Sequence, residues 1–183
     1  MISNSVFKLS VLALGTVALV ACSNSEKKQI AAESYVDWVD PLIGSGGHGH
    51  VFVGASIPHG MIQLGPNNNK KGWDWCSGYH DSDSTIIGFA HTHLSGTGIA
   101  DLGDILLMPA VSVIDSAGYL PSSAYVSTFL KQEELVTPGF YQVKLHPSGV
   151  NVELTAGERV GMHRYVYPSD KKAQVVVDLE NSA

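Results

Sequence analysis

The most constraining feature of this sequence is a set of alternating apolar and polar runs in its C-terminal part. They cover residues 140–145, 150–155, 159–167 and 173–179, and Pro, Gly, Ser and Asp separate them. Period-two runs of this length between turn residues predict antiparallel strands with one wet face. After residue 21 no stretch has the period of a long amphipathic helix. We therefore expect an all-β chain, an antiparallel β-sandwich spanning residues 35–183.

The first 34 residues have the composition of an export signal and a tether. A short apolar run, residues 9–20, follows a start whose one charged residue is Lys8. The run is too short to span a bilayer, which needs about 20 apolar residues. It ends in Leu19-Val20-Ala21-Cys22, which is similar to a bacterial lipobox. We predict a lipoprotein signal peptide at 1–21, lipidation of Cys22, a polar tether at 22–34 and a lipid-anchored location in the bacterial envelope, periplasmic or surface-exposed. The alternative is an ordinary signal peptide with a chance cysteine.

Charge and cysteine content exclude some classes of protein. The formal net charge of −6 is opposite to that of nucleic-acid-binding domains, so no nucleic-acid partner is expected. Cys76 is the one cysteine besides Cys22, so the domain has no internal disulfide. The chain stops directly after the strand predicted at 173–179, so we expect the sandwich to be truncated.

Three polar, glycine-rich segments precede these strands. Residues 44–50 (GSGGHGH) suit a tight turn with solvated histidines, and a phosphate loop is excluded because no Lys-Ser/Thr follows. Residues 71–80 (KGWDWCSGYH) mix three aromatic side chains with Asp, Ser and His. Indole faces stack on sugar rings while carboxylates bind sugar hydroxyls, so this segment predicts a carbohydrate site. The alternative is that the tryptophans pack in the core.

The third segment contains a His-x-His pair and two aspartates. His91 and His93 are predicted to share one face of a strand, with Asp101 and Asp104 close behind. One interpretation is that these four residues form a metal-dependent hydrolytic site. Only two histidines are close together, however, whereas zinc sites normally use three or four dedicated ligands. A hydrogen-bonded network around a pocket is the favoured interpretation, so no metal ligand is assigned in this chain.

Taken together, these segments resemble the start of family 92 glycoside hydrolases, from about residue 35 to the end of the chain. The matching blocks are residues 39–44 (VDPLIG), 46–50 (GGHGH), 53–55 (VGA), 58–64 (PHGMIQL), 73–79 (WDWCSGY), 89–98 (FAHTHLSGTG) and 101–109 (DLGDILLMP). The resemblance implies an N-terminal β-sandwich that packs on a C-terminal (α/α) barrel, with the active site between them. It also implies a calcium-dependent, inverting exo-α-mannosidase.

The resemblance places the catalytic acid and base, and the calcium ligands, in the C-terminal domain outside this chain. The chain alone is then expected to be inactive, with a mannose-containing glycan, the membrane and its own C-terminal domain as partners. Substrate contact is predicted for Trp73, Asp74, Trp75, Cys76, Tyr79 and His93. Trp75 is the favoured stacking ring because it adjoins Cys76 and Ser77, small residues that would let a sugar approach. The alternative function is a non-catalytic, carbohydrate-binding surface lipoprotein.

Overall fold

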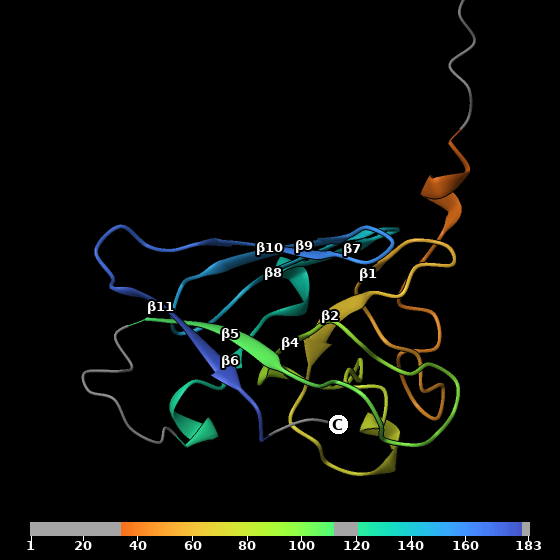
Figure 1. Cartoon of the computed structure of the whole chain (residues 1–183), viewed down its shortest axis with the longest axis horizontal. Coiled ribbons are helices and arrows are strands. Elements are labelled where there is room, and N and C mark those ends of the chain that lie inside the picture. Colours follow the sequence, from red (N-terminus) through yellow and green to blue (C-terminus); the bar gives the residue numbers. More distant parts are fainter. Residues whose placement is uncertain (1–33, 112–120, 181–183) are drawn as a thin grey trace, which may run out of the picture. The chain divides into compact units, whose positions relative to one another are not determined.

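A computed structural model describes residues 34–111 and 121–180 (Figure 1). The chain divides into two compact units, 1–34 and 35–183, and the helices and strands of the described residues all belong to the second. The predicted signal peptide, the tether and Cys22 lie outside the described residues. Within those residues the helices are short 3₁₀ turns, η1 (Tyr35–Trp38), η2 (Trp73–Trp75), η3 (Ser122–Ala124) and η4 (Lys131–Glu133). None of them has the length and apolar character that a membrane-spanning helix requires.

The strands form two main antiparallel sheets and a small third one. The five-stranded sheet has the order β1 (Ala55–Ser56), β2 (Gln63–Asn67), β4 (Gly88–Ala90), β5 (Leu106–Val111), β11 (Ala173–Asp178). The four-stranded sheet has the order β10 (Gly161–Val166), β9 (Asn151–Ala156), β8 (Phe140–Lys144), β7 (Glu134–Thr137). Strands β3 (Thr85–Ile86) and β6 (Ser127–Thr128) pair by themselves. The all-β, antiparallel fold class is confirmed.

The four runs predicted in the C-terminal part are strands β8, β9, β10 and β11. The first three are hydrogen-bonded neighbours in one sheet, whereas β11 pairs along its whole length with β5 in the other. Figure 1 shows β11 and β5 in one layer and β7 to β10 in the layer above. The last described strand, β11, therefore completes the sheet that is otherwise built from the first half of the domain.

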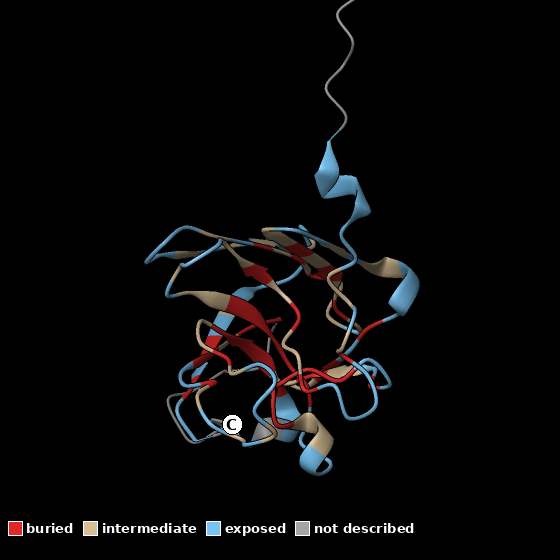
Figure 2. Ribbon diagram, turned by 90° about the vertical axis from the view of Figure 1, so that its right-hand side faces the viewer, coloured by how far each residue is buried: buried red, intermediate tan, exposed pale blue. Residues whose placement is uncertain are grey.

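The core lies between the two main sheets. Alternation along β8 and β9 directs Tyr141, Val143, Val152 and Leu154 inward, each at most 1% exposed. They belong to one cluster with side chains of the facing sheet, such as Phe89, whose ring centroid lies 6.5 Å from that of Tyr141. Each large side chain buried in this way stabilises the fold by about 1.5–3 kcal/mol. Figure 2 shows the buried residues in red on the inner strands.

The glycine-rich segments are loops that hydrogen-bond to one another. The backbone N–H of Asp81 donates to the Ser45 carbonyl at 2.9 Å, and that of Gly96 donates to the His50 carbonyl at 2.6 Å. The Ser77 hydroxyl donates to the same His50 carbonyl at 2.7 Å. Three segments that lie apart in the sequence are thus held as one loop cluster, which contains η2 and most of the predicted site residues.

Candidate functional site

Trp73 is the most exposed tryptophan of the loop cluster. It begins η2, directly after Gly72, and its side chain is 61% exposed. Its indole N–H donates to the Gly98 carbonyl at 2.5 Å, and its ring packs edge-on to His50 at a centroid distance of 4.2 Å. Gly98 has φ +66°, and a Cβ there would lie 3.0 Å from the Trp73 ring. The ring is therefore anchored along one side and open to solvent on the rest.

Asp74 accepts hydrogen bonds from two histidines on one carboxylate oxygen. Nδ1 of His48 lies 2.6 Å from Oδ1 and Nε2 of His50 lies 3.2 Å from the same atom. The hydrogen bond from His48 is the main cause that lowers the pKa of Asp74, with a smaller contribution from His50. Asp74, the residue after Trp73, is thus held ionised by its two histidine partners. The sequence was interpreted as a tight turn with both histidines solvated. Their spacing of two residues was a signal that the two rings could share one partner.

Trp75 is half-buried and already has partners. Its ring stacks on His80 at 4.3 Å with an interplanar angle of 22°, and its N–H donates to Asp83 Oδ2 at 2.9 Å. Burial opposes ionisation of Asp83, but hydrogen bonds from Lys71, Thr85 and Trp75 lower its pKa to about 2. One face of the Trp75 ring is therefore occupied within the domain.

The structure places Cys76 and Ser77 differently from what the sequence argument for Trp75 assumed. Cys76 and Ser77 are each only 2% exposed, so they point into the domain and open no space beside Trp75. Of the two tryptophans in η2, Trp73 is the more accessible to solvent, at 61% exposure, whereas Trp75 is half-buried. A ring offered to a sugar must be accessible, and Trp73 meets that condition better than Trp75.

Tyr79 and His93 are buried within the domain. Tyr79 is 1% exposed, its hydroxyl donates to Glu134 Oε2 at 2.9 Å, and burial raises its pKa well above the usual range. His93 is 5% exposed, and burial lowers its pKa to about 4, so the ring is neutral near pH 7. Its Nδ1 lies 2.7 Å from the Gln63 carbonyl and its Nε2 lies 2.6 Å from the Asn67 side chain. A neutral ring donates through Nδ1 and accepts at Nε2, with the Asn67 amide turned to donate.

The predicted grouping of His91, His93, Asp101 and Asp104 is not formed. Strand β4 ends at Ala90, before the histidine pair, so the expected common strand face does not exist. His91 lies against His163 of β10, with 3.3 Å between their Nε2 atoms, whereas His93 faces Gln63 and Asn67. The one metal-competent group of three among the described residues is His48, His50 and Asp74.

The calcium implied by the resemblance does not fit that group. Calcium takes six to eight oxygen ligands, whereas two of these three groups offer imidazole nitrogen. We therefore assign no calcium ligand among residues 34–111 and 121–180.

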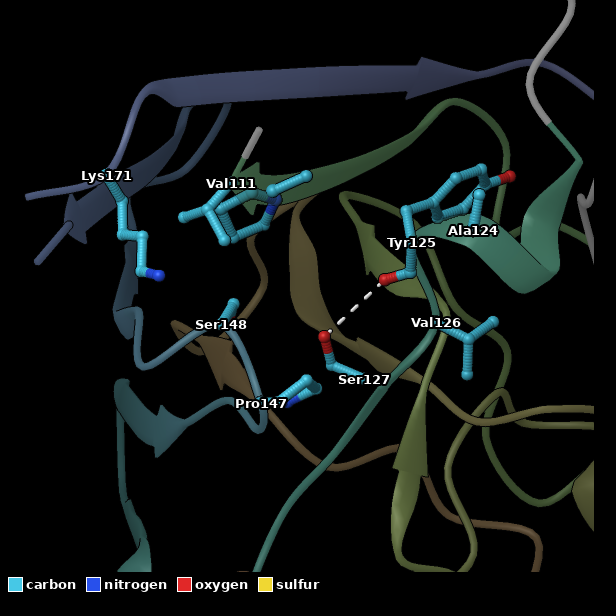
Figure 3. Close-up of a pocket in the computed structure, with 10 residues that line it drawn as sticks. Val111, Ala124, Tyr125, Val126, Ser127, Pro147, Ser148 and Lys171 are labelled. Atoms are coloured by element: carbon cyan, nitrogen blue, oxygen red, sulfur yellow. Dashed lines mark hydrogen bonds between the residues drawn. The ribbon is translucent and has the colours of Figure 1, made fainter. Parts of the chain in front are cut away.

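A separate pocket lies away from the predicted site residues, beside the end of β5 and the start of β6. Its volume is about 350 Å³, and Figure 3 shows Val111, Tyr125, Ser127 and Lys171 among the residues around it. Its lining is mostly apolar or small, and none of the six predicted contact residues contributes to it. The chemistry-bearing side chains instead gather in the loop cluster.

Comparison with known proteins identifies the family of the chain. The family model for the glycosyl hydrolase family 92 N-terminal domain matches residues 38–183. A family GH92 α-mannosidase from Bacteroides thetaiotaomicron, solved with mannoimidazole, is 39% identical with a TM-score of 0.72, over 80% of this chain and 20% of its own. A family GH92 inverting mannosidase from the same organism is 28% identical with a TM-score of 0.66, over 84% and 20%.

A curated relative from Arthroderma benhamiae, described as an uncharacterized secreted glycosidase, is 28% identical over 155 residues, which is 78% of this chain and 19% of the relative. The chain thus spans about a fifth of the length of the proteins it matches. The family model covers most of the chain, and the solved relatives share its sandwich. By sequence and by structure, this chain belongs to glycosyl hydrolase family 92, and its residues 38–183 correspond to the N-terminal domain of that family.

Proposed function

We propose that this chain is the substrate-binding and site-shaping domain of an inverting exo-α-mannosidase that releases α-linked mannose from glycans. Family membership supports a glycosidase. Two solved relatives are described as mannosidases, one of them inverting and another bound to mannoimidazole. The comparisons favour this role over a carbohydrate-binding protein without catalysis, because these relatives are all described as glycosidases or mannosidases.

The observation that carries the proposal is that the exposed Trp73 and the ionised Asp74 are consecutive residues whose side chains both contact His48 and His50. An indole face packs on the C–H face of a sugar, and an adjacent carboxylate accepts hydrogen bonds from its hydroxyls. His48 and His50 hold Asp74 in position through its Oδ1 atom. In this proposal Trp75 is a secondary contact, and the buried Cys76, Tyr79 and His93 act indirectly, by holding the loops in place.

Asp74 is a binding residue in this proposal, not one of a catalytic pair. Inversion requires two carboxyl groups about 6.5–9.5 Å apart, one protonated and one ionised. The group of His48, His50 and Asp74 has a single carboxylate, and its lowered pKa is unsuited to a general acid at neutral pH. The acid and base are therefore assigned to the remainder of the enzyme, as is calcium.

The proposal extends to the cell envelope. We infer that residues 1–21 direct export and that Cys22 is lipidated, because Leu19-Val20-Ala21-Cys22 closes the apolar run. The residues after Cys22 are polar and charged, which suits a flexible tether between a lipid and a folded domain. The described residues begin beyond this segment, so the sequence alone supports this part.

The test is the activity and stereochemistry of the full-length enzyme. It should hydrolyse aryl α-mannosides and α-mannobioses in the presence of calcium, and proton NMR should show β-mannose as the first product. The corresponding α-glucosides and β-mannosides are the controls. Preference for another glycoside, or release of α-mannose first, would overturn the proposal.

A further inference from the structure

The loop cluster brings two histidines and one aspartate together at the surface. The nitrogens of His48 and His50 and the carboxylate oxygen of Asp74 all lie within 4.8 Å of one another. The histidines come from the glycine-rich loop and the aspartate from η2, so the group exists only in the folded domain. We propose that His48, His50 and Asp74 form a binding site for a zinc-class transition-metal ion.

Two of the three ligand separations can be compared directly with tetrahedral coordination. With metal–ligand bonds of about 2.0–2.1 Å, neighbouring ligand atoms in a tetrahedral zinc site lie about 3.3 Å apart. His50 Nε2 and Asp74 Oδ1 are already 3.2 Å apart. His48 Nδ1 and Asp74 Oδ1 are hydrogen-bonded at 2.6 Å and must separate by about 0.7 Å. His48 can make this movement because its side chain is 78% exposed.

Two of the three ligands are held in place before a metal binds. His50 is 7% exposed, with the Trp73 ring edge against it at 4.2 Å. Its backbone carbonyl accepts hydrogen bonds from the Ser77 hydroxyl and the Gly96 N–H. Asp74 is fixed by the η2 turn, where the Cys76 N–H donates to the Trp73 carbonyl. Ordered ligands of this kind lose little entropy on binding, which favours affinity.

The donor set determines the class of metal. Neutral imidazole suits zinc, copper, nickel and cobalt, whereas calcium and magnesium require oxygen ligands. Three protein ligands, with the exposed His48 on the outer side, leave a fourth position for water. The inference does not depend on the proposed glycosidase role, since it rests on these three side chains alone.

The experiment is a metal titration of the tag-free, chelator-treated protein, carried out on a Cys22→Ala background to remove one competing thiol. Cobalt is followed by its tetrahedral d–d absorption, zinc by calorimetry, and copper by quenching of tryptophan fluorescence near Trp73. The variants are His48→Ala, His50→Ala and Asp74→Asn. The matched control is His146→Ala, because His146 pairs with the Glu133 carboxylate at 2.6 Å but belongs to no group of three ligands in the described residues.

We expect one zinc or cobalt ion per chain, unaffected by excess calcium, with affinity lowered at least about tenfold in each ligand variant. His146→Ala should bind like the parent protein. His48→Ala keeps the test decisive if a substitution at the buried His50 unfolds the domain, because His48 is exposed. Absence of stoichiometric binding, equal binding by the ligand variants, or displacement by calcium would each overturn the proposal. In any of these outcomes the three side chains form a hydrogen-bonded network only.

Discussion

Trp73 and Trp75 lie two residues apart, yet the structure predicts opposite consequences when each is replaced by alanine in the full-length enzyme. Trp73→Ala removes an exposed ring, one hydrogen bond to a neutral carbonyl and an edge contact with His50. Because most of the Trp73 ring is already exposed to water, we expect its removal to lower the free energy of unfolding by only about 1 kcal/mol. The same change removes the proposed stacking surface, which is worth about 1–3 kcal/mol in binding. Catalytic efficiency, kcat/KM, should therefore fall about ten- to a hundredfold.

Trp75→Ala should act mainly on stability. It removes the stack on His80 at 4.3 Å and the hydrogen bond to the Asp83 carboxylate at 2.9 Å. A ring pair contributes about 0.5–1.5 kcal/mol and a hydrogen bond to a charged group about 1.5–3 kcal/mol. Together these terms predict a loss of about 2–4 kcal/mol, because the Asp83 side chain is fully buried and loses a donor.

The assay is thermal melting and steady-state kinetics on the same preparations, with aryl α-mannoside as substrate. Trp73→Phe is the control, since it retains an aromatic face and should keep most of the activity lost in Trp73→Ala. Trp75→Ala should melt well below Trp73→Ala, and its folded fraction should lose less efficiency. The reasoning is refuted if Trp73→Ala keeps normal kcat/KM while Trp75→Ala loses it at an unchanged melting temperature.

Three further predictions use other parts of the chain. Cys22→Ala should move the protein from the membrane to the soluble fraction, and an unmodified N-terminal mass in the parent protein would count against lipidation. The chain alone should give no hydrolysis of aryl α-mannoside above the buffer rate, and turnover that survives repurification would contradict this. His93 has its pKa lowered to about 4 by burial, whereas an unfolded histidine has a pKa near 6.5, so acid favours the unfolded state. The folded state should lose about 2 kcal/mol between pH 7 and pH 5, and urea unfolding of His93→Gln should show a weaker pH dependence at those two values.

The sequence alone predicted the three strands of the four-stranded sheet, β8, β9 and β10, that alternate apolar and polar residues. In residues 140–166 the strands alternate between a more buried and a more exposed face, fully buried in β8 and β9 and half-buried in β10, because successive side chains point to opposite sides. The resemblance to family 92 was also readable, because seven ordered blocks carry more information than any one motif. Trp73 and Asp74 could be singled out because this glycine-flanked segment combines indole rings with a carboxylate, the groups that bind sugar rings and sugar hydroxyls.

The tertiary structure decided which of these side chains solvent can reach. Sequence favoured Trp75, but His80 covers one face of that ring, and no local pattern encodes a contact made by the folded loop. Likewise, β4 ended before His91, so His91 and His93 found different partners in β10 and β2. The meeting of His48 and His50 with Asp74 also depends on hydrogen bonds between loops far apart in sequence. Glycine-rich loops lack a period, so their geometry follows from long-range contacts, and only the folded chain fixes those.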